Sequence, residues 1–163
     1  MKYTILGSVL VLLILIVGIS AYMGMGRNGA TDATTEVLGF GSGRSAVVYK
    51  SPTCGCCVGY ADELEKQGFD VEVVSTEDMS KIKEQFGVPA DKQSCHTIAI
   101  DDYVVEGHVP MEAVEKLLTE KPDIEGIGLP RMPSGTPGMP GPKRAPYEVY
   151  QLSDGAVSSY VTI

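Results

Sequence analysis

The chain has 163 residues, the length of a single domain, and its 13 Lys and Arg against 21 Asp and Glu give a formal net charge of −8. This balance argues against a nucleic-acid-binding protein, because affinity for a phosphate backbone comes mainly from clustered Lys and Arg. Four cysteines are too few for a small disulfide-rich scaffold. Three of them nevertheless crowd together at Cys54, Cys56 and Cys57, and Cys95 is followed directly by a histidine. Soft metal ligands are therefore concentrated in two short segments.

Residues 1–25 are predicted to form a membrane segment that is not part of the fold. No charged residue occurs between Tyr3 and Met25. At ~1.5 Å per residue, such a helix is ~34 Å long, enough to cross a hydrocarbon core of ~30 Å. We expect a single-pass anchor, with a cleaved signal peptide as the alternative. Residues 26–45 are predicted to be a flexible tether, and the remaining domain to lie on the extracytoplasmic side, or to be secreted or periplasmic after cleavage.

Residues 46–163 begin with alternating strand and helix patterns. Short apolar runs predict strands at residues 46–49, 70–74, 97–100 and 103–105, and helical spacing predicts helices at residues 58–67, 76–86 and 110–121. The order is therefore β-α-β-α-β-β-α. With cysteines at the first strand-to-helix junction, this order is typical of a thioredoxin-like α/β fold.

Residues 126–146 have a different composition. Six of the ten prolines lie there, interleaved with glycines, and proline lacks an N–H and fixes φ. We expect an irregular Pro/Gly/Met-rich loop with no helix and no central strand, carrying Met132 and Met139. Residues 147–152 and 156–163 then flank Ser153-Asp154-Gly155 and predict a C-terminal hairpin.

The segment from Thr53 to Cys57 combines the spacings C-x-x-C, C-x-C and C-C. At a helix N-terminus, free N–H groups and the helix dipole favour thiolates. Such thiolates can exchange disulfides, with Cys54 attacking and Cys57 resolving, or they can hold soft metal ions. Three cysteines within four residues suit thiolates that bridge several small soft cations, as Cu(I) does. Zinc usually takes two separated ligand pairs and is the less favoured alternative.

A second group of ligands is expected to face these cysteines. In a thioredoxin-like fold, the turn entering the third strand lies beside the first helix and usually carries a cis-proline, whereas here Ser94-Cys95-His96-Thr97 fills it. Cys95 should face the cluster, and His96 can point to the other face because neighbours alternate along a strand. His108 should lie at the same end of the fold. The predicted metal ligands are Cys54, Cys56, Cys57, Cys95 and His108, assisted by His96 and by the thioethers of Met132 and Met139.

Four motifs together resemble the CopG-like family of copper-resistance and metal-binding proteins. They are residues 53–57, 94–97, 106–110 and 128–139, and the likeness runs from about Ala46 to the C-terminus. The resemblance implies an extracytoplasmic thioredoxin-like domain that binds copper through Cys and His in copper resistance, with a redox role for the copper compatible with it. The implied cofactor is copper, as Cu(I) or Cu(II). The implied partners are copper ions, extracytoplasmic copper-handling proteins and the membrane, through the N-terminal helix.

The sequence leaves three functions open, and with them the question of whether the protein is an enzyme. The favoured one is a Cu(I)-binding protein tethered at the outer face of the cytoplasmic membrane, because ligand density and compartment both indicate it. The second is a thiol–disulfide oxidoreductase that uses Cys54 and Cys57, against which the missing cis-proline counts. The third is an adaptor module of a copper-efflux complex.

Overall fold

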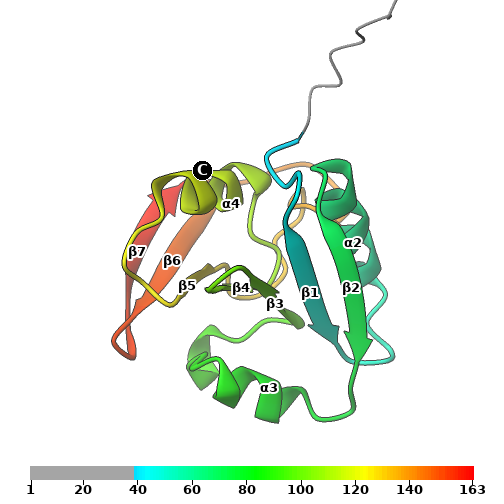
Figure 1. Ribbon diagram of the computed structural model, residues 1–163, viewed down its shortest axis with the longest axis horizontal. Coiled ribbons are helices and arrows are strands. Elements are labelled where there is room, and N and C mark those ends of the chain that lie inside the picture. Colours follow the sequence, from blue (N-terminus) through cyan, green and yellow to red (C-terminus); the bar gives the residue numbers. More distant parts are fainter. Residues whose placement is uncertain (1–38) are drawn as a thin grey trace, which may run out of the picture. The chain divides into compact units, whose positions relative to one another are not determined.

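The computed structural model describes residues 39–163, which contain three α-helices and a seven-stranded sheet (Figure 1). In chain order the elements are β1 (Ser45–Lys50), α2 (Cys56–Lys66), β2 (Asp70–Ser75), α3 (Met79–Gln85), a 3-10 helix (Ala90–Lys92), β3 (His96–Ile100), β4 (Tyr103–Glu106), α4 (Met111–Glu120), β5 (Gly126–Gly128), β6 (Glu148–Ser153) and β7 (Ala156–Thr162). The α/β class and the predicted order through α4 are confirmed.

The predicted membrane segment and most of the predicted tether fall outside the described residues. Among residues 39–163, no helix has the length and apolar character needed to span a bilayer. The last part of the predicted tether is described, and it contacts the domain. The Phe40 ring lies 5.4 Å from the Phe69 ring, and the Gly41 N–H donates to the Gln67 carbonyl.

The sheet brings the ends of three strands together at one edge. Its strand order is β2-β1-β3-β4-β5-β6-β7, with β1 and β2 parallel and β3 antiparallel to both β1 and β4. In this register His96 pairs with Lys50, and Thr97 pairs with Glu106. The end of β1, the start of β3 and the end of β4 therefore meet beside the beginning of α2.

Residues 126–128 correct the expectation that the proline-rich stretch contains no central strand. They form β5, which lies between β4 and β6 in the sheet. The prolines of this stretch begin only at Pro130, so all three residues of β5 keep the N–H that a central strand needs. Irregular structure follows until β6, and the predicted C-terminal hairpin is confirmed as β6 and β7.

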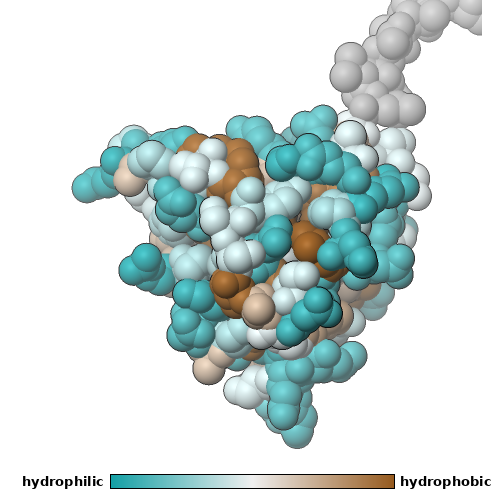
Figure 2. Space-filling model, turned by 90° about the vertical axis from the view of Figure 1, so that its left-hand side faces the viewer, coloured by the Kyte–Doolittle hydropathy of each residue, from teal (hydrophilic) through white to brown (hydrophobic). Residues whose placement is uncertain are grey.

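The two faces of the sheet carry different layers. Val105 packs into the main core with Tyr60 of α2 and Leu117 of α4, whereas its neighbour Val104 packs on the other face with Leu152. Figure 1 shows α4 and α3 on opposite sides of strands β3 to β5. On the side that carries β7, hydrophobic residues form small patches separated by hydrophilic ones (Figure 2). Most of the large apolar side chains are thus buried between the sheet and the layers that cover it.

The helix starts differ from the predicted ones by a few residues. α2 begins at Cys56, two residues before the predicted start, so Cys56 and Cys57 are its first helical residues. α3 begins at Met79 with Asp78 as its N-cap, three residues after the predicted start at residue 76, and Pro110 directly precedes α4 instead of opening it. The earlier start of α2 matters most, because it places two cysteine sulfurs on the first helical turn.

The proline-rich loop packs closely against this first turn of α2. Gly138 has a φ of +74°, and a Cβ at this position would lie 2.7 Å from the Tyr60 nitrogen and 2.8 Å from the Cys56 oxygen. The loop is also held by the Tyr147 hydroxyl, which donates to the Ser134 carbonyl. Only glycine allows this approach of the two backbones.

We predict that Gly138→Ala destabilises the protein by about 2 kcal/mol or more, because it adds a backbone clash to the strain of a positive φ. Gly141→Ala is the matched control. Gly141 has a φ of +96° but its Cβ would meet nothing closer than 3.5 Å, so strain alone should cost about 1 kcal/mol. Urea unfolding of both variants measures the difference. Equal losses would show that the loop does not depend on this contact.

Candidate metal centre

The four cysteines converge where the N-terminus of α2 faces the start of β3. The Cys56 Sγ lies 3.4 Å from the Cys54 Sγ and 3.7 Å from the Cys95 Sγ. All four Sγ atoms lie within 4.8 Å of one another. Cys54 and Cys57 form a disulfide, whereas Cys56 and Cys95 are free thiols. The fold therefore joins the two cysteine-containing segments that the sequence singles out.

Both histidines lie against Cys95. The Cys95 Sγ is 3.3 Å from the His96 Nδ1 and 3.2 Å from the His108 Nε2, and both imidazoles are fully buried. His96 does not point to the opposite side of the sheet from Cys95, as strand alternation would allow. The reason is local: Cys95 precedes β3 and His96 is its first residue, so the alternation of a regular strand does not apply between them.

The two methionines are placed differently. The Met132 Sδ lies 3.9 Å from the Cys56 Sγ, and the Met132 side chain is 49% exposed, so this thioether stands at the outer side of the cysteines. In the described part of the chain, no sulfur contact of this kind links Met139 to the cysteines. The Met139 N–H instead closes a turn by donating to the Thr136 carbonyl.

The proline-rich loop orients His108 through a backbone carbonyl. The His108 Nδ1 lies 2.7 Å from the Pro137 oxygen, and a carbonyl can only accept. Nδ1 therefore carries the proton, and the lone pair of Nε2 faces Cys95. A hydrogen bond on the remote ring nitrogen is the usual way in which proteins fix a metal-binding imidazole. The direction in which a loop carbonyl points leaves no pattern in the sequence, so the sequence does not predict this contact.

Burial sets the protonation of these groups. Burial lowers the pKa of His96 to about 3, with smaller effects from His108 and Lys83, and burial also lowers the pKa of His108. Both imidazoles are therefore neutral at pH 7, the form that binds metals. Burial, and then the neighbouring Cys56, raises the pKa of the Cys95 thiol to about 12. The His96 Nε2 is buried with no hydrogen-bond partner among the described residues. Buried polar atoms without a partner are uncommon, so this nitrogen is one that a ligand could satisfy.

The first turn of α2 carries two of the four cysteines. The N-cap Gly55 makes no side-chain capping hydrogen bond, and the first turn holds no acidic residue. Cys56 and Cys57 therefore lie on the turn whose N–H groups lack partners within the helix. Thiolates are stabilised in such positions.

The donor set fits a soft cation. It consists of thiols, a thioether and neutral imidazoles, which suit Cu(I), whereas hard cations such as Mg²⁺ and Ca²⁺ take oxygen ligands. Glu106, a buried carboxylate two residues before His108, instead forms an ion pair with Lys83. Reduction of the Cys54–Cys57 disulfide by a thiol reductant, with two electrons and two protons, would raise the number of free thiols from two to four.

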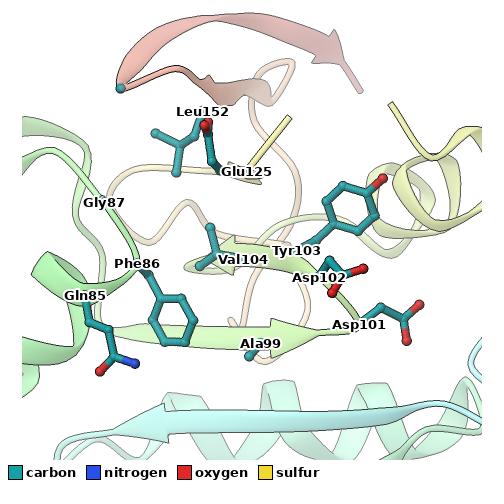
Figure 3. A pocket seen from close by; sticks show the side chains of 11 residues that line it. Gln85, Phe86, Gly87, Ala99, Asp101, Asp102, Tyr103, Val104, Glu125 and Leu152 are labelled. Carbon is teal, nitrogen blue, oxygen red and sulfur yellow. The ribbon is translucent and has the colours of Figure 1, made fainter. Parts of the chain in front are cut away.

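A separate cavity of about 440 Å³ opens on the α3 side of the sheet (Figure 3). The side chains of Phe86, Val104 and Leu152 line its apolar part, and Asp101 and Asp102 line one end. It contains neither a cysteine nor a histidine. The cavity is therefore distinct from the thiol and imidazole cluster and contributes no soft ligand to it.

An α/β fold with clustered thiols and neutral imidazoles defines a candidate soft-metal protein, and the comparisons narrow this class. A family model described as "Protein of unknown function, DUF411" matches residues 92–139. The solved structure of copper resistance protein CopG, form 2, is 38% identical, with a TM-score of 0.68, 74% of this chain covered and 98% of that one. For form 1 the values are 39%, 0.67, 73% and 96%. No curated protein matches the chain. At this identity and coverage, the chain belongs to the CopG family.

The depressed pKa of His96 predicts a pH-dependent stability. Between its ordinary value of 6.5 and about 3, the unfolded chain binds a proton that the folded chain excludes, so stability falls as the pH drops below 6.5. From pH 7 to pH 5 this residue should account for about 2 kcal/mol. Urea unfolding of the metal-free chain and of His96→Asn at both pH values measures it. The variant should lose about 2 kcal/mol less than the wild type, and identical losses would refute the assignment.

Proposed function

We propose that this protein binds copper as Cu(I) in copper resistance or homeostasis. The observation that carries the proposal is the convergence of four Sγ atoms within 4.8 Å of one another, with two neutral imidazoles against one of them. The related structures are named copper resistance proteins, which supports copper over zinc as the metal. The ligands would be Cys54, Cys56, Cys57, Cys95 and His108, with His96 and Met132 beside them.

Further parts of the proposal concern fold, redox state and location. Parallel β1 and β2 joined by α2, followed by antiparallel β3 and β4, support a thioredoxin-like fold. Imidazole tolerates both Cu(I) and Cu(II), so His108 beside thiolates would allow the copper to change oxidation state. Residues 1–25 would anchor the protein in the membrane, with the copper-binding domain on the extracytoplasmic side, as the uncharged, mainly apolar sequence of residues 3–25 suggests.

Anaerobic Cu(I) binding tests the proposal. The reduced chain should take up Cu(I). The double variant Cys56→Ser/Cys95→Ser should bind Cu(I) more than about 100-fold more weakly, because it loses two ligands, whereas loss of a hydrogen-bond partner of a ligand costs about 10- to 100-fold. Met132→Leu should weaken binding less, and Met79→Leu, on α3, serves as the thioether control. Competition with a chromophoric Cu(I) chelator measures the affinities. A chain that takes up zinc but not Cu(I) would overturn the proposal.

The disulfide favours thiol–disulfide exchange as a second candidate function. Cys54 is half-buried, whereas its disulfide partner Cys57 is fully buried. An incoming thiolate would therefore reach the Cys54 sulfur first. Attack there breaks the Cys54–Cys57 bond, forms a mixed disulfide at Cys54 and releases the Cys57 thiolate, which can then resolve the mixed disulfide.

Trapping decides this second function. With exchange, Cys57→Ser should accumulate mixed disulfides at Cys54 with extracytoplasmic proteins, because the resolving thiolate is missing. Cys54→Ser, which lacks the attacking sulfur, is the control and should accumulate none at this position. Non-reducing gels followed by mass spectrometry detect the adducts. A Cys57→Ser chain without adducts, together with no insulin reduction by the wild type, would exclude exchange.

A further inference from the structure

A buried ion pair lies directly behind the segment that carries Cys95 and His96. The Lys83 Nζ is 2.5 Å from the Glu106 Oε1, and the two residues are only 4% and 0% exposed. Lys83 comes from α3 and Glu106 from the end of β4. The Lys83 Nζ also donates to the Thr97 Oγ1 at 3.0 Å. Neither charged group belongs to the proposed ligands, although a buried charge pair is costly to desolvate.

The Glu106 carboxylate holds both ends of that segment. Its Oε1 accepts from the backbone N–H of Ser94 at 2.6 Å, and its Oε2 accepts from the Thr97 hydroxyl at 2.6 Å. Cys95 and His96 are the two residues between these anchors. With both flanking residues fixed to one carboxylate, the backbone between them is constrained and its side chains project towards the imidazole and thiol cluster.

The same segment is tied to His108 and to the loop. The Gly107 N–H donates to the His96 carbonyl at 3.0 Å, and Gly107 precedes His108. Gly107 has a φ of +76°, and a Cβ there would lie 2.6 Å from the Ser94 Cβ. The Ser94 hydroxyl donates to the Arg131 carbonyl, one residue before Met132. The position of Ser94 is therefore transmitted to the segments that carry His108 and Met132.

Alternation along the strands places this network on the opposite face of the sheet from the cluster. Thr97 and Glu106 are cross-strand partners, and both face α3, whereas the flanking Ile98 and Val105 face the main core. A carboxylate and an ammonium on the α3 side can thus fix the backbone without occupying space in the metal centre.

We propose that the Lys83–Glu106 pair is a positioning device for the metal centre. Glu106 clamps Ser94 and Thr97 so that the Cys95 thiol and the His96 imidazole are held ready for Cu(I), and Lys83 compensates the buried carboxylate. The proposal rests on the proposed copper-binding function for its role, but the clamp itself is a property of the metal-free chain. α3 thereby contributes to the metal centre although it supplies no ligand.

Two double variants of the full-length chain separate the clamp from the burial of charge. Lys83→Met/Glu106→Gln removes both charges but keeps a side-chain carbonyl that can accept from the Ser94 N–H. Lys83→Met/Glu106→Leu removes both charges and the acceptor. Neither leaves an unpaired buried charge. Lys116→Met/Glu120→Leu, which removes an exposed ion pair on α4, is the control.

The first measurement needs no metal. In the reduced, metal-free chain, iodoacetamide should alkylate Cys95 at least about fivefold faster in Lys83→Met/Glu106→Leu than in Lys83→Met/Glu106→Gln, because loss of one backbone hydrogen bond releases the thiol. Peptide mass spectrometry gives the rate for Cys95 separately from the other cysteines. Equal rates in the two double variants would overturn the clamp, whatever the chain binds.

The second measurement is Cu(I) affinity by chelator competition. The variant without the acceptor should bind about 10- to 100-fold more weakly than the variant with it, as expected for lost support of ligands. A merely stabilising network would lower the melting temperature of both variants and leave their affinities equal, which would contradict the proposal. If the wild type binds no Cu(I), the proposed function fails and the alkylation rates alone decide the clamp.

A milder variant tests the clamp even if the double variant without the acceptor does not fold. Should Lys83→Met/Glu106→Leu not fold, Thr97→Val removes one of the two anchors and keeps the ion pair. It should still raise the alkylation rate of Cys95 by about threefold, since one neutral hydrogen bond is lost. An unchanged rate in a folded Thr97→Val chain would overturn the proposal.

Discussion

The candidate centre depends on the position of Cys95. Within residues 39–163, it belongs to both groups of clustered donor atoms, the four sulfurs and the thiol with two imidazoles. Its Sγ lies within 3.7 Å of Cys56, His96 and His108, which come from α2, β3 and the segment after β4. A shift of this one residue would separate thiols from imidazoles. The packing around it therefore determines whether the donors act as one centre.

Much of this arrangement could be predicted from the sequence, because it follows from strand order. The β-α-β connection around the cysteines and the helical spacing after them place the thiols at the start of α2. The strand β5 could not be predicted, since the prolines from Pro130 onward dominate the composition around it. The hydrogen-bond partners of Glu106 and the carbonyl that faces His108 depend on tertiary packing. No residue spacing in the sequence predicts these contacts.

The proline-rich loop acts on the centre mainly through its backbone. Because proline has no N–H, a proline-rich loop has few backbone donors for its own carbonyls, and the Pro137 carbonyl accepts from His108 instead. Gly138 lets the next part of the loop lie directly on the first turn of α2. Composition suggested a role for thioethers. The structure shows that close approach and carbonyl direction are the contributions this loop makes most clearly.

A disulfide and a bound metal would compete for the same sulfur atoms. While Cys54 and Cys57 are bonded to each other, neither can act as a thiolate ligand, and Cys56 and Cys95 are the free thiols. A chain in this state offers a soft cation half of its cysteine sulfurs, as free thiols, together with the imidazoles. Two-electron reduction would restore the full set of four thiols, and a metal bound to them would protect the sulfur atoms from re-oxidation. If the chain performs both proposed functions, copper binding and thiol exchange would draw on the same sulfur atoms, and the redox state of Cys54 and Cys57 would link the two.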